Sequence, residues 1–370
     1  MNPHLEEALT LAERGLGRTS PNPAVGAVIV RDGEVVGQGF YVASGVKHAE
    51  VLAIEEAGAK ARGATMYVTL EPHSHQGRTP PCVDAIIAAG ISKVVSIMED
   101  PNPEVHGRGF ARLSDAGVEI EIDSSYQVRA AKLNEAFIHF MNTGLPLVTL
   151  KAAVTLDGKI AAPEDSTSPG WITSEIARAH VQTLRHLTDA ILTGIGTVLA
   201  DDCRLNDRTG ESRARPLLRI VLDSQLRMPA ESQMVASCAS DVMVITTSAA
   251  SAERRKRLES KGVRVEVLED ASGRASLRAM VELLAREKYL SLMIEAGSRV
   301  NWTALESGVA DKIFFYYAPK ILGGTLSLPV AGGAGRPKRS DAILFRDLAL
   351  HPIALNEFAV EAWLEKEHRL

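Results

Sequence analysis

The sequence has few cysteines and no stretch that combines the length and the apolarity of a membrane span. Its three cysteines, Cys82, Cys203 and Cys238, are too few for a disulfide scaffold, which favours a reducing compartment. The first eight residues carry acids where a secretory signal has a basic segment and then an apolar core. We therefore expect no export and a cytoplasmic location.

An excess of charge of either sign is also lacking. The 41 basic residues stand against 46 acidic ones, which leaves a formal net charge of -5. Nothing in this balance attracts nucleic acid in general, so neither nucleic acid nor a membrane is expected as a partner. The sequence instead favours a small-molecule substrate that is recognised locally.

The composition is typical of a globular protein, and the length and the pattern of elements predict two α/β units. Hydrophobic residues make up 45% and charged residues 24% of 370 residues, and at about 150 residues per domain this length predicts two or three domains. The segment Thr143-Gly-Leu-Pro146 is a natural boundary between the units. Helices are expected at 3–16, 49–61, 81–89, 126–141, 174–187 and 276–287, with a helix and a strand within 109–122. Strands are expected at 24–30, 35–40, 65–70, 93–97, 147–155, 190–193, 218–222, 242–246, 263–267 and 291–295.

Two segments of the first unit carry the residue types of a catalytic zinc site. His48-Ala-Glu50 opens a predicted helix, and His73 lies nine residues before Cys82, the last residue of a Pro-Pro-Cys sequence that opens the next helix. A catalytic zinc takes three protein ligands and leaves a position for water, while a carboxylate that is not a ligand moves protons. Zinc nucleobase deaminases have H-x-E followed by P-C-x-x-C, and this chain matches the first motif fully and the second only in its Pro-Cys. The sequence therefore predicts His48 as a metal ligand and Glu50 as the catalytic group, with the segment from His73 to Cys82 as the partner segment of the site.

Ordered segments along the chain resemble the bifunctional riboflavin-biosynthesis enzymes, in which a pyrimidine deaminase is fused to a ribosyl reductase. The resemblance implies a cytidine-deaminase-like α/β/α domain over 1–144 and a dihydrofolate-reductase-like α/β domain over 147–370. It rests on Thr-Ser-Pro-Asn22-Pro-Ala-Val-Gly26, His48-Ala-Glu50, Gly-Arg-Thr-Pro-Pro-Cys82, Asp100-Pro-Asn102-Pro, Leu156-Asp-Gly158, Trp171-Ile-Thr-Ser174, Leu199-Ala-Asp-Asp202 and Glu295-Ala-Gly297.

For the first domain the resemblance implies zinc-dependent hydrolytic deamination of 2,5-diamino-6-(5-phosphoribosylamino)pyrimidin-4-one. It places Asn22, His75 and Asn102 at the substrate, although an asparagine beside proline is equally typical of a turn. The family usually has a zinc-binding cysteine after Glu-Pro, where this chain has His73. The resemblance thus implies His48, His73 and Cys82 as the zinc ligands. Histidine is a competent zinc ligand, and its neutral imidazole makes the site one unit more positive than a thiolate does.

For the second domain the resemblance implies reduction of the ribosyl side chain to ribityl by NADPH. No G-x-G-x-x-G follows the first strand, which disfavours a Rossmann domain, whereas residues 295–303 run from a strand into a helix whose start can hold a phosphate. The implied cofactor contacts are Val154, Trp171, Thr197, Asp201, Ser224, Gly297, Ser298, Arg299, Val300, Asn301, Trp302 and Thr303. The implied contacts of the reductase substrate are Lys151, Ser168, Arg185, Leu205, Arg208 and Glu295.

Three alternatives remain open at this stage. His73 could spoil the metal site, which would leave a reductase with a degenerate, non-catalytic first domain. The chain could also be a regulatory nucleotide-binding protein with neither activity. Arg185 and Arg208 could be ordinary surface residues, since this is the default for a single arginine. A nucleic-acid deaminase is disfavoured by the acidic balance and by the fused reductase. The resemblance also implies a homo-oligomer.

Overall fold

The computed structural model describes residues 2–76, 80–163 and 170–365. The chain divides into two compact units, unit 1 with Met1–Gly144 and Ser212–Arg215, and unit 2 with Leu145–Glu211 and Pro216–Leu370. Within the described residues, every helix is too short or too polar to cross a membrane.

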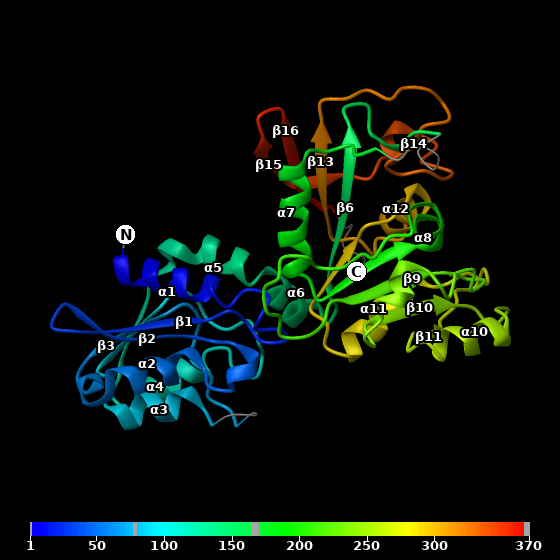
Figure 1. The fold of residues 1–370 in the computed structure, drawn as a ribbon. Helices are drawn as coiled ribbons and strands as arrows, with labels where there is room; N and C mark the ends of the chain where they lie inside the picture. The colour runs from blue at the N-terminus through cyan, green and yellow to red at the C-terminus, as the bar shows by residue number, and fades with distance from the viewer. Residues whose placement is uncertain (1, 77–79, 164–169, 366–370) are drawn as a thin grey trace. The chain divides into compact units, whose positions relative to one another are not determined.

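Unit 1 is built on a five-stranded sheet with the order β2-β1-β3-β4-β5 (Figure 1). The predicted hairpin is present, because Asp32 and Gly33 both adopt the positive φ that a tight two-residue turn requires. β3, β4 and β5 run parallel to one another, and β1 is antiparallel to β3. The strands are β1 (Gly26–Arg31), β2 (Glu34–Phe40), β3 (Thr65–Val68), β4 (Lys93–Ser96) and β5 (Glu119–Ile122).

Helices cover both faces of this sheet, with α1 and α5 on one side and α2, α3 and α4 on the other (Figure 1). α2 lies very close to β2, since a Cβ added at Gly37 would stand 2.2 Å from the carbonyl oxygen of Ala53. The helical segments are α1 (Pro3–Glu13), η1 (Ala43–Gly45), α2 (Ala49–Ala57), η2 (Gly58–Ala61), α3 (Cys82–Ala89), α4 (Arg108–Asp115), η3 (Ser124–Tyr126), α5 (Gln127–Leu133) and α6 (Glu135–Thr143).

The single helix predicted over 126–141 is wrong. The structure has two helices, α5 and α6, separated at Asn134. The buried side chain of Asn134 accepts a hydrogen bond from the Ala24 backbone nitrogen at 2.8 Å and donates one to the Ala24 carbonyl at 3.0 Å. These hydrogen bonds between residues far apart in the sequence stabilise the break between the two helices. The apolar periodicity of the sequence does not predict such a break.

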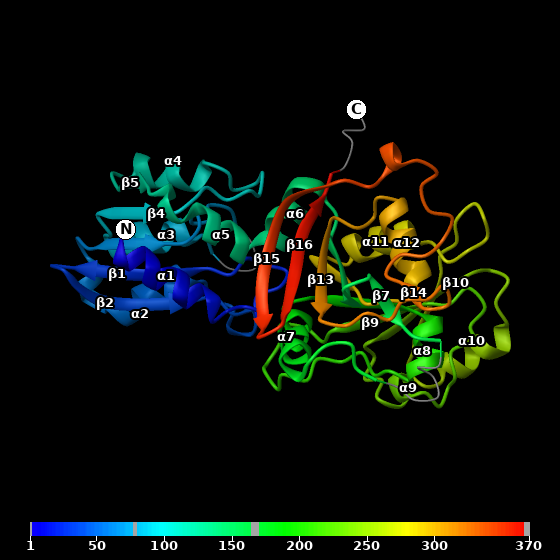
Figure 2. The same cartoon turned by 90° about the horizontal axis from the view of Figure 1, so that it is seen from above.

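Unit 2 is built on a nine-stranded sheet with the order β11-β10-β9-β8-β12-β6-β13-β16-β15. Figure 2 shows β13, β16 and β15 side by side at one end of this sheet. The first seven of these strands are parallel, and β16 runs antiparallel to both of its neighbours. The strands are β6 (Leu147–Thr155), β8 (Ala190–Gly194), β9 (Leu218–Leu222), β10 (Val242–Thr246), β11 (Arg264–Val267), β12 (Ser291–Ile294), β13 (Lys312–Ala318), β15 (Phe345–Ala354) and β16 (Glu357–Leu364). A separate pair joins β7 (Lys159–Ala161) to β14 (Leu328–Pro329).

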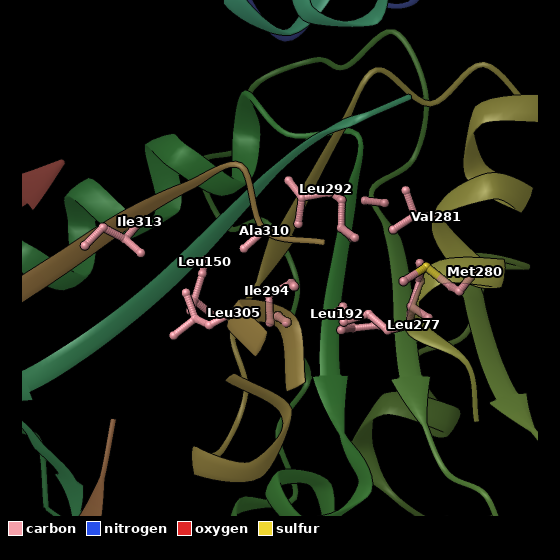
Figure 3. Packing of buried hydrophobic residues seen from close by; sticks show 14 of the residues in the cluster. Leu150, Leu192, Leu277, Met280, Val281, Leu292, Ile294, Leu305, Ala310 and Ile313 are labelled. Carbon is pink, nitrogen blue, oxygen red and sulfur yellow. The ribbon is translucent and has the colours of Figure 1, made fainter. Parts of the chain in front are cut away.

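Two hydrophobic layers enclose the parallel part of this sheet. On one face α11 (Leu277–Arg286) and α12 (Ser298–Glu306) pack on alternate strand residues such as Leu192 and Ile294 (Figure 3). On the opposite face, the intervening residues, among them Ile191, contact the remaining helices. Those helices are α7 (Glu175–His186), α8 (Ile195–Asp201), α9 (Gln233–Ala236) and α10 (Ala252–Glu259), and a short turn η4 (Arg339–Asp341) precedes β15.

Candidate functional site

Three metal-binding side chains converge in unit 1. His48 is the residue before α2, Cys82 is the first residue of α3, and His73 lies in the segment that follows β3. One ligand atom from each lies within 4.8 Å of the other two. The Cys82 Sγ is 3.4 Å from Nδ1 of His48, and the rings of His48 and His73 have centroids 4.4 Å apart. The three predicted ligands therefore form one cluster that can hold a metal ion.

The electrostatics of this cluster fit a cation. Burial, with the neighbouring His48 and His75, lowers the pKa of His73 to about 4, so its imidazole is neutral at pH 7, the form that binds metal. Its Nδ1 is buried and has no hydrogen-bond partner among the described residues. Burial and the charge of Glu50 raise the pKa of the Cys82 thiol, and a cation beside the sulfur reverses that effect.

Glu50 lies in the first turn of α2, two residues after His48. Glu50 is only 3% exposed, and its carboxylate contacts the Cys82 thiol. The carboxylate is thus held beside the metal-binding atoms and away from bulk water. This position is suited to proton transfer at the metal centre.

The predicted pyrimidine contacts are held in different ways. Asn22 donates from Nδ2 to the hydroxyl of Tyr41 at 2.7 Å, and the Tyr41 ring lies edge-on to His48 with centroids 5.1 Å apart. The ring of His75 lies 5.6 Å from that of His73. Asn102 is held in a turn, since its Oδ1 accepts a hydrogen bond from the nitrogen of Glu104. Asn22 and His75 are therefore near the metal cluster, and Asn102 belongs to an ordered loop.

A buried carboxylate that the sequence analysis did not single out organises that loop. The Glu71 carboxylate accepts hydrogen bonds from four backbone nitrogens. These belong to Asp100, Gly107, Gly109 and Phe110, at 2.8 to 3.3 Å. Burial raises the pKa of Asp100 to about 6, and the charges of Glu71 and Glu50 act in the same direction. The available signal for Glu71 was an acid directly after the strand predicted at 65–70.

Unit 2 has a cavity of about 1320 Å³ at the carboxyl ends of β6, β12 and β8. Glycines 194 and 196 of the strand-to-helix turn after β8 are part of its wall. Twelve residues predicted as cofactor or substrate contacts line it: Lys151, Trp171, Arg185, Thr197, Asp201, Leu205, Arg208, Glu295, Gly297, Ser298, Arg299 and Val300.

A buried ion cluster stands at one end of this cavity. Arg185 donates to both carboxylate oxygens of Glu295, at 2.8 and 3.0 Å, and Lys151 Nζ lies 3.2 Å from the same carboxylate. Burial by itself would raise the pKa of Glu295, but the two cations outweigh it and lower that pKa to about 2. The Glu295 side chain is 12% exposed, so it is a fixed negative charge within the wall.

Five predicted cofactor contacts lie outside the wall of the cavity, and a further prediction, Ser168, lies outside the described residues. Val154 is in the hydrophobic core. The Ser224 hydroxyl accepts a hydrogen bond from the Ala275 nitrogen, and Asn301 donates to the carbonyl of Val330. Thr303 donates to the carbonyl of Arg299, and the Trp302 ring lies against Gly333. The wall also contains Arg204, Arg227 and Gln233, which the sequence analysis missed because a single polar residue carries no pattern.

Comparison with known proteins finds a family match for each unit. Residues 2–98 match the cytidine and deoxycytidylate deaminase zinc-binding region, and residues 146–350 match the RibD C-terminal domain. The riboflavin biosynthesis protein RibD of Bacillus amyloliquefaciens is 40% identical over 338 residues, which are 91% of this chain and 90% of that protein. The RibD of Escherichia coli is 40% identical over 358 residues, or 93% of this chain and 94% of that protein.

Solved structures extend the likeness to the whole fold. The structure of Acinetobacter baumannii RibD has a TM-score of 0.86 to this chain at 35% identity and covers 98% of both chains. A diaminohydroxyphosphoribosylaminopyrimidine deaminase/5-amino-6-(5-phosphoribosylamino)uracil reductase of Thermotoga maritima has a TM-score of 0.82 at 34% identity, again over 98% of both. The predicted fold class of a cytidine-deaminase-like unit followed by a reductase unit is confirmed, and the chain belongs to the RibD family of riboflavin biosynthesis proteins.

Proposed function

We propose that this chain catalyses two successive steps of riboflavin biosynthesis. The first is hydrolytic deamination of 2,5-diamino-6-(5-phosphoribosylamino)pyrimidin-4-one at the metal cluster, with zinc as the metal. The second is reduction of the ribosyl side chain to ribityl in the cavity of unit 2, with NADPH as the reductant. The observation that carries the proposal is the presence on one chain of three metal donors beside a buried Glu50 and of a cation-rich cavity around Glu295.

His48, His73 and Cys82 would hold the metal, which when bound supplies Lewis-acid activation of a water molecule. The Glu50 carboxylate accepts the proton that this water loses as it adds to the amino-bearing ring carbon. Glu50 then delivers the proton to the amino nitrogen, which leaves as ammonia, so water and the amine are exchanged for a carbonyl oxygen and ammonia. Burial of Glu50 keeps this proton at the reacting atoms.

Substrate recognition in unit 1 is assigned to the groups that surround the cluster. The Tyr41 hydroxyl orients the amide of Asn22, so that the remaining donor and acceptor of this side chain can meet the pyrimidine edge. His75 stands next to His73 on the same segment. Asn102 presents its amide from the loop that Glu71 and Asp100 hold.

The cavity of unit 2 provides separate places for the sugar and its phosphate. NADPH, when bound, supplies a hydride to the open-chain form of the ribosylamine. Glu295 fixes the Lys151 ammonium at the carboxyl edge of the sheet, where it presents a proton-bearing group to the sugar. Arg185 is already engaged by Glu295 and by the Asn206 carbonyl. Arg208 makes no ion pair with any residue that the structure describes, and we assign it to the substrate phosphate.

The alternative of a reductase with a non-catalytic first unit is less well supported. A degenerate unit has no need to keep three metal donors within 4.8 Å of one another or to bury a carboxylate beside them. His73 is neutral at pH 7, as a ligand must be.

We also assign the chain a cytoplasmic location and a homo-oligomeric state. The low cysteine content supports the first. Exposed leucines on the edge strand β15, Leu348 and Leu350, support the second, because such an edge is commonly covered by another chain. Light scattering of the purified protein tests the oligomeric state, and a monomeric mass would contradict it.

The two-step proposal is tested by counting products. Zinc-loaded protein is mixed with the phosphorylated diaminopyrimidine, first without NADPH and then with it. We expect one ammonia per substrate in the first stage and one NADPH oxidised per substrate in the second. Ammonia that appears only after NADPH is added, or NADPH oxidation without ammonia release, would contradict the proposed order.

A further inference from the structure

Part of the wall of the unit 2 cavity belongs to a segment without regular structure. Residues 202–211, which follow α8, form neither a helix nor a strand. Leu205, Asn206 and Arg208 of this segment line the cavity, and Arg208 is exposed. Such a segment has no helical or sheet hydrogen bonds of its own, so contacts with other elements must hold its backbone. Arg208 can meet a phosphate at a fixed place only if such contacts exist.

The C-terminal half of α7 supplies these contacts. Its side chains Gln182, Arg185 and His186 stand at positions i, i+3 and i+4 and so share one face of the helix. Nη1 of Arg185 donates to the Asn206 carbonyl at 3.0 Å, and Oε1 of Gln182 accepts from the Arg208 nitrogen at 3.0 Å. The backbone of the segment is therefore hydrogen-bonded to one helix on either side of the residue between them.

That residue, Asp207, forms a largely buried pair with the third side chain of the helix face. Oδ2 of Asp207 lies 2.9 Å from Nδ1 of His186, and each of the two side chains is 10% exposed. Because an ionised carboxylate only accepts hydrogen bonds, Nδ1 of His186 donates the proton that joins them. Oδ1 of Asp207 accepts from the nitrogen and the hydroxyl of Thr209, at 2.9 and 2.8 Å. Asp207 thus connects the helix with the next part of the segment.

The pair also keeps an acid away from the base that follows it in the chain. Arg208 lines the cavity, whereas neither Asp207 nor His186 belongs to the wall. A carboxylate beside a guanidinium in the sequence is a competing partner for it, and an arginine that is already paired offers less to a phosphate. His186 and Thr209 engage both carboxylate oxygens of Asp207. The Arg208 guanidinium, which has no ion pair within the described part of the chain, therefore faces the cavity without a neighbouring acid to neutralise it.

We propose that Asp207 and His186 are positioning residues of the reductase substrate site. Their pair holds residues 206–208 against α7 and so places the Arg208 guanidinium for the substrate phosphate, while neither residue touches the substrate. The inference rests on the proposed reductase function of unit 2 and on the assignment of Arg208 to the phosphate. A charged donor that is held in place before binding loses less entropy on binding, so the pair acts on KM and not on kcat.

Reductase kinetics of the whole protein with two compounds test this role. NADPH is supplied with the deaminated substrate, or with the same compound without its phosphate. Asp207→Ala should raise KM for the phosphorylated compound about 5- to 20-fold and keep kcat within about 2-fold. KM for the compound without phosphate should change less than about 2-fold, because Arg208 has no phosphate to meet there. General damage to the fold would instead affect both compounds alike.

His186→Ala removes the same pair from the side of the helix. It should show the same selective rise in KM as Asp207→Ala, so either variant tests the pair if the other fails to fold. Circular dichroism and a thermal unfolding scan identify the folded variants.

A double variant shows whether the effect passes through Arg208. Arg208→Gln alone should raise KM for the phosphorylated compound about 10- to 100-fold, because a charge-assisted contact is lost. Addition of Asp207→Ala should change this KM by less than about 2-fold, because a residue that acts only through Arg208 then has nothing left to position.

Glu211→Ala is the matched control. Glu211 lies in the same segment and is exposed, and its backbone nitrogen, not its carboxylate, donates to the Thr209 hydroxyl at 3.3 Å. This variant removes the same charge as Asp207→Ala and keeps that hydrogen bond. Both KM values should stay within about 2-fold of the native values.

An equal rise of both KM values in Asp207→Ala, a fall of kcat alone, or no change would overturn the positioning role and leave the reductase function standing. A further rise of KM in the double variant would also overturn it, and so would an equal selective rise in Glu211→Ala. Equal KM values of the two compounds with the native protein would overturn the assignment of Arg208 and the inference with it. Absence of NADPH oxidation by the native protein would overturn the reductase function itself.

Discussion

The metal cluster of unit 1 and the cavity of unit 2 depend on different properties of the chain. The cluster consists of His48, His73 and Cys82, which come from the starts of two helices and from one loop. Burial lowers the pKa of His73 and raises that of Cys82, so it favours the neutral form of both side chains. The cavity has a wall of many residues, and its fixed feature is an ion cluster around Glu295. A change of one donor atom should therefore decide the first site, while the second should respond to the balance of charge.

Removal of a metal donor should have the largest effect. Cys82→Ala takes away the buried sulfur between His48 and Glu50, and we expect zinc content and ammonia release to fall to background. NADPH oxidation with the deaminated substrate should remain. Metal analysis and the two assays check this. Cys238→Ala, at a cysteine outside the cluster, is the control and should change neither.

Removal of the Glu295 charge from the ion cluster should have the next largest effect on activity, and this effect should be confined to the cavity of unit 2. Glu295→Gln leaves the buried cations of Lys151 and Arg185 without their partner, which should lower the free energy of unfolding by about 3 kcal/mol. Reductase activity should be lost and ammonia release kept. Denaturant unfolding measures the stability. The same substitution at Glu231, in an exposed pair with Arg257, should cost less than about 1 kcal/mol.

The pH dependence of this stability difference has a definite sign. The pKa of Glu295 is about 2 in the folded protein, below its ordinary value of 4.5. The stabilising contribution of the carboxylate is thus fully present above about pH 4.5 and is lost as the pH falls towards 2. The gap between the native protein and Glu295→Gln should be constant from pH 7 to about 5 and shrink below that. A gap that shrinks already near neutral pH would contradict the low pKa.

A smaller effect is expected from Glu71, whose carboxylate contacts only backbone nitrogens of a loop. Glu71→Gln keeps the shape of the side chain but weakens its hydrogen bonds to the nitrogens of the loop that contains Asn102. We expect a loss of about 1 to 3 kcal/mol in unfolding free energy and a higher KM for the deaminase substrate. Glu55→Gln, in an exposed pair with Lys47, serves as the comparison. Equal effects of the two variants would argue against a role of Glu71 in ordering the loop.

The smallest effect is expected when one metal ligand is replaced by a ligand of another type. His73→Cys replaces a neutral imidazole by a group that binds zinc as a thiolate, which makes the site one unit less positive. Zinc should resist a chelator better, and ammonia release should stay within about tenfold of the native rate. Loss of zinc from this variant would show that the position of the imidazole, and not only its donor atom, holds the metal.

The two sites also differ in how far the sequence predicts them. Two members of the metal cluster, His48 and Cys82, stand in the motifs H-x-E and Pro-Pro-Cys at helix starts. His73 stands in neither motif, and it was expected only from the resemblance to the family. In the cavity, the strand-to-helix turn at Gly297 was predicted, whereas Arg227 was not. The place of Arg227 in the cavity wall depends on β9 lying beside β8, and sheet order is a long-range property that no local pattern contains.

The same limit applies to the elements of the fold. Helices with regular apolar spacing and the Asp32-Gly33 hairpin were predicted close to their observed bounds. No strand was expected after residue 295, yet β13, β15 and β16 complete the sheet there. β15 is exposed along most of its length, so it lacks the alternation that marks a half-buried strand. The break at Asn134 likewise depends on a distant partner, Ala24.

The central claim is that two separate sites on this chain perform two separate reactions, and Glu50→Gln tests it most directly. This variant keeps the three metal donors and removes only the group that moves protons. Ammonia release should fall by about 10²- to 10⁴-fold, with zinc content unchanged and with native rates of NADPH oxidation on the deaminated substrate. Loss of both activities in a folded, zinc-loaded variant would contradict the claim.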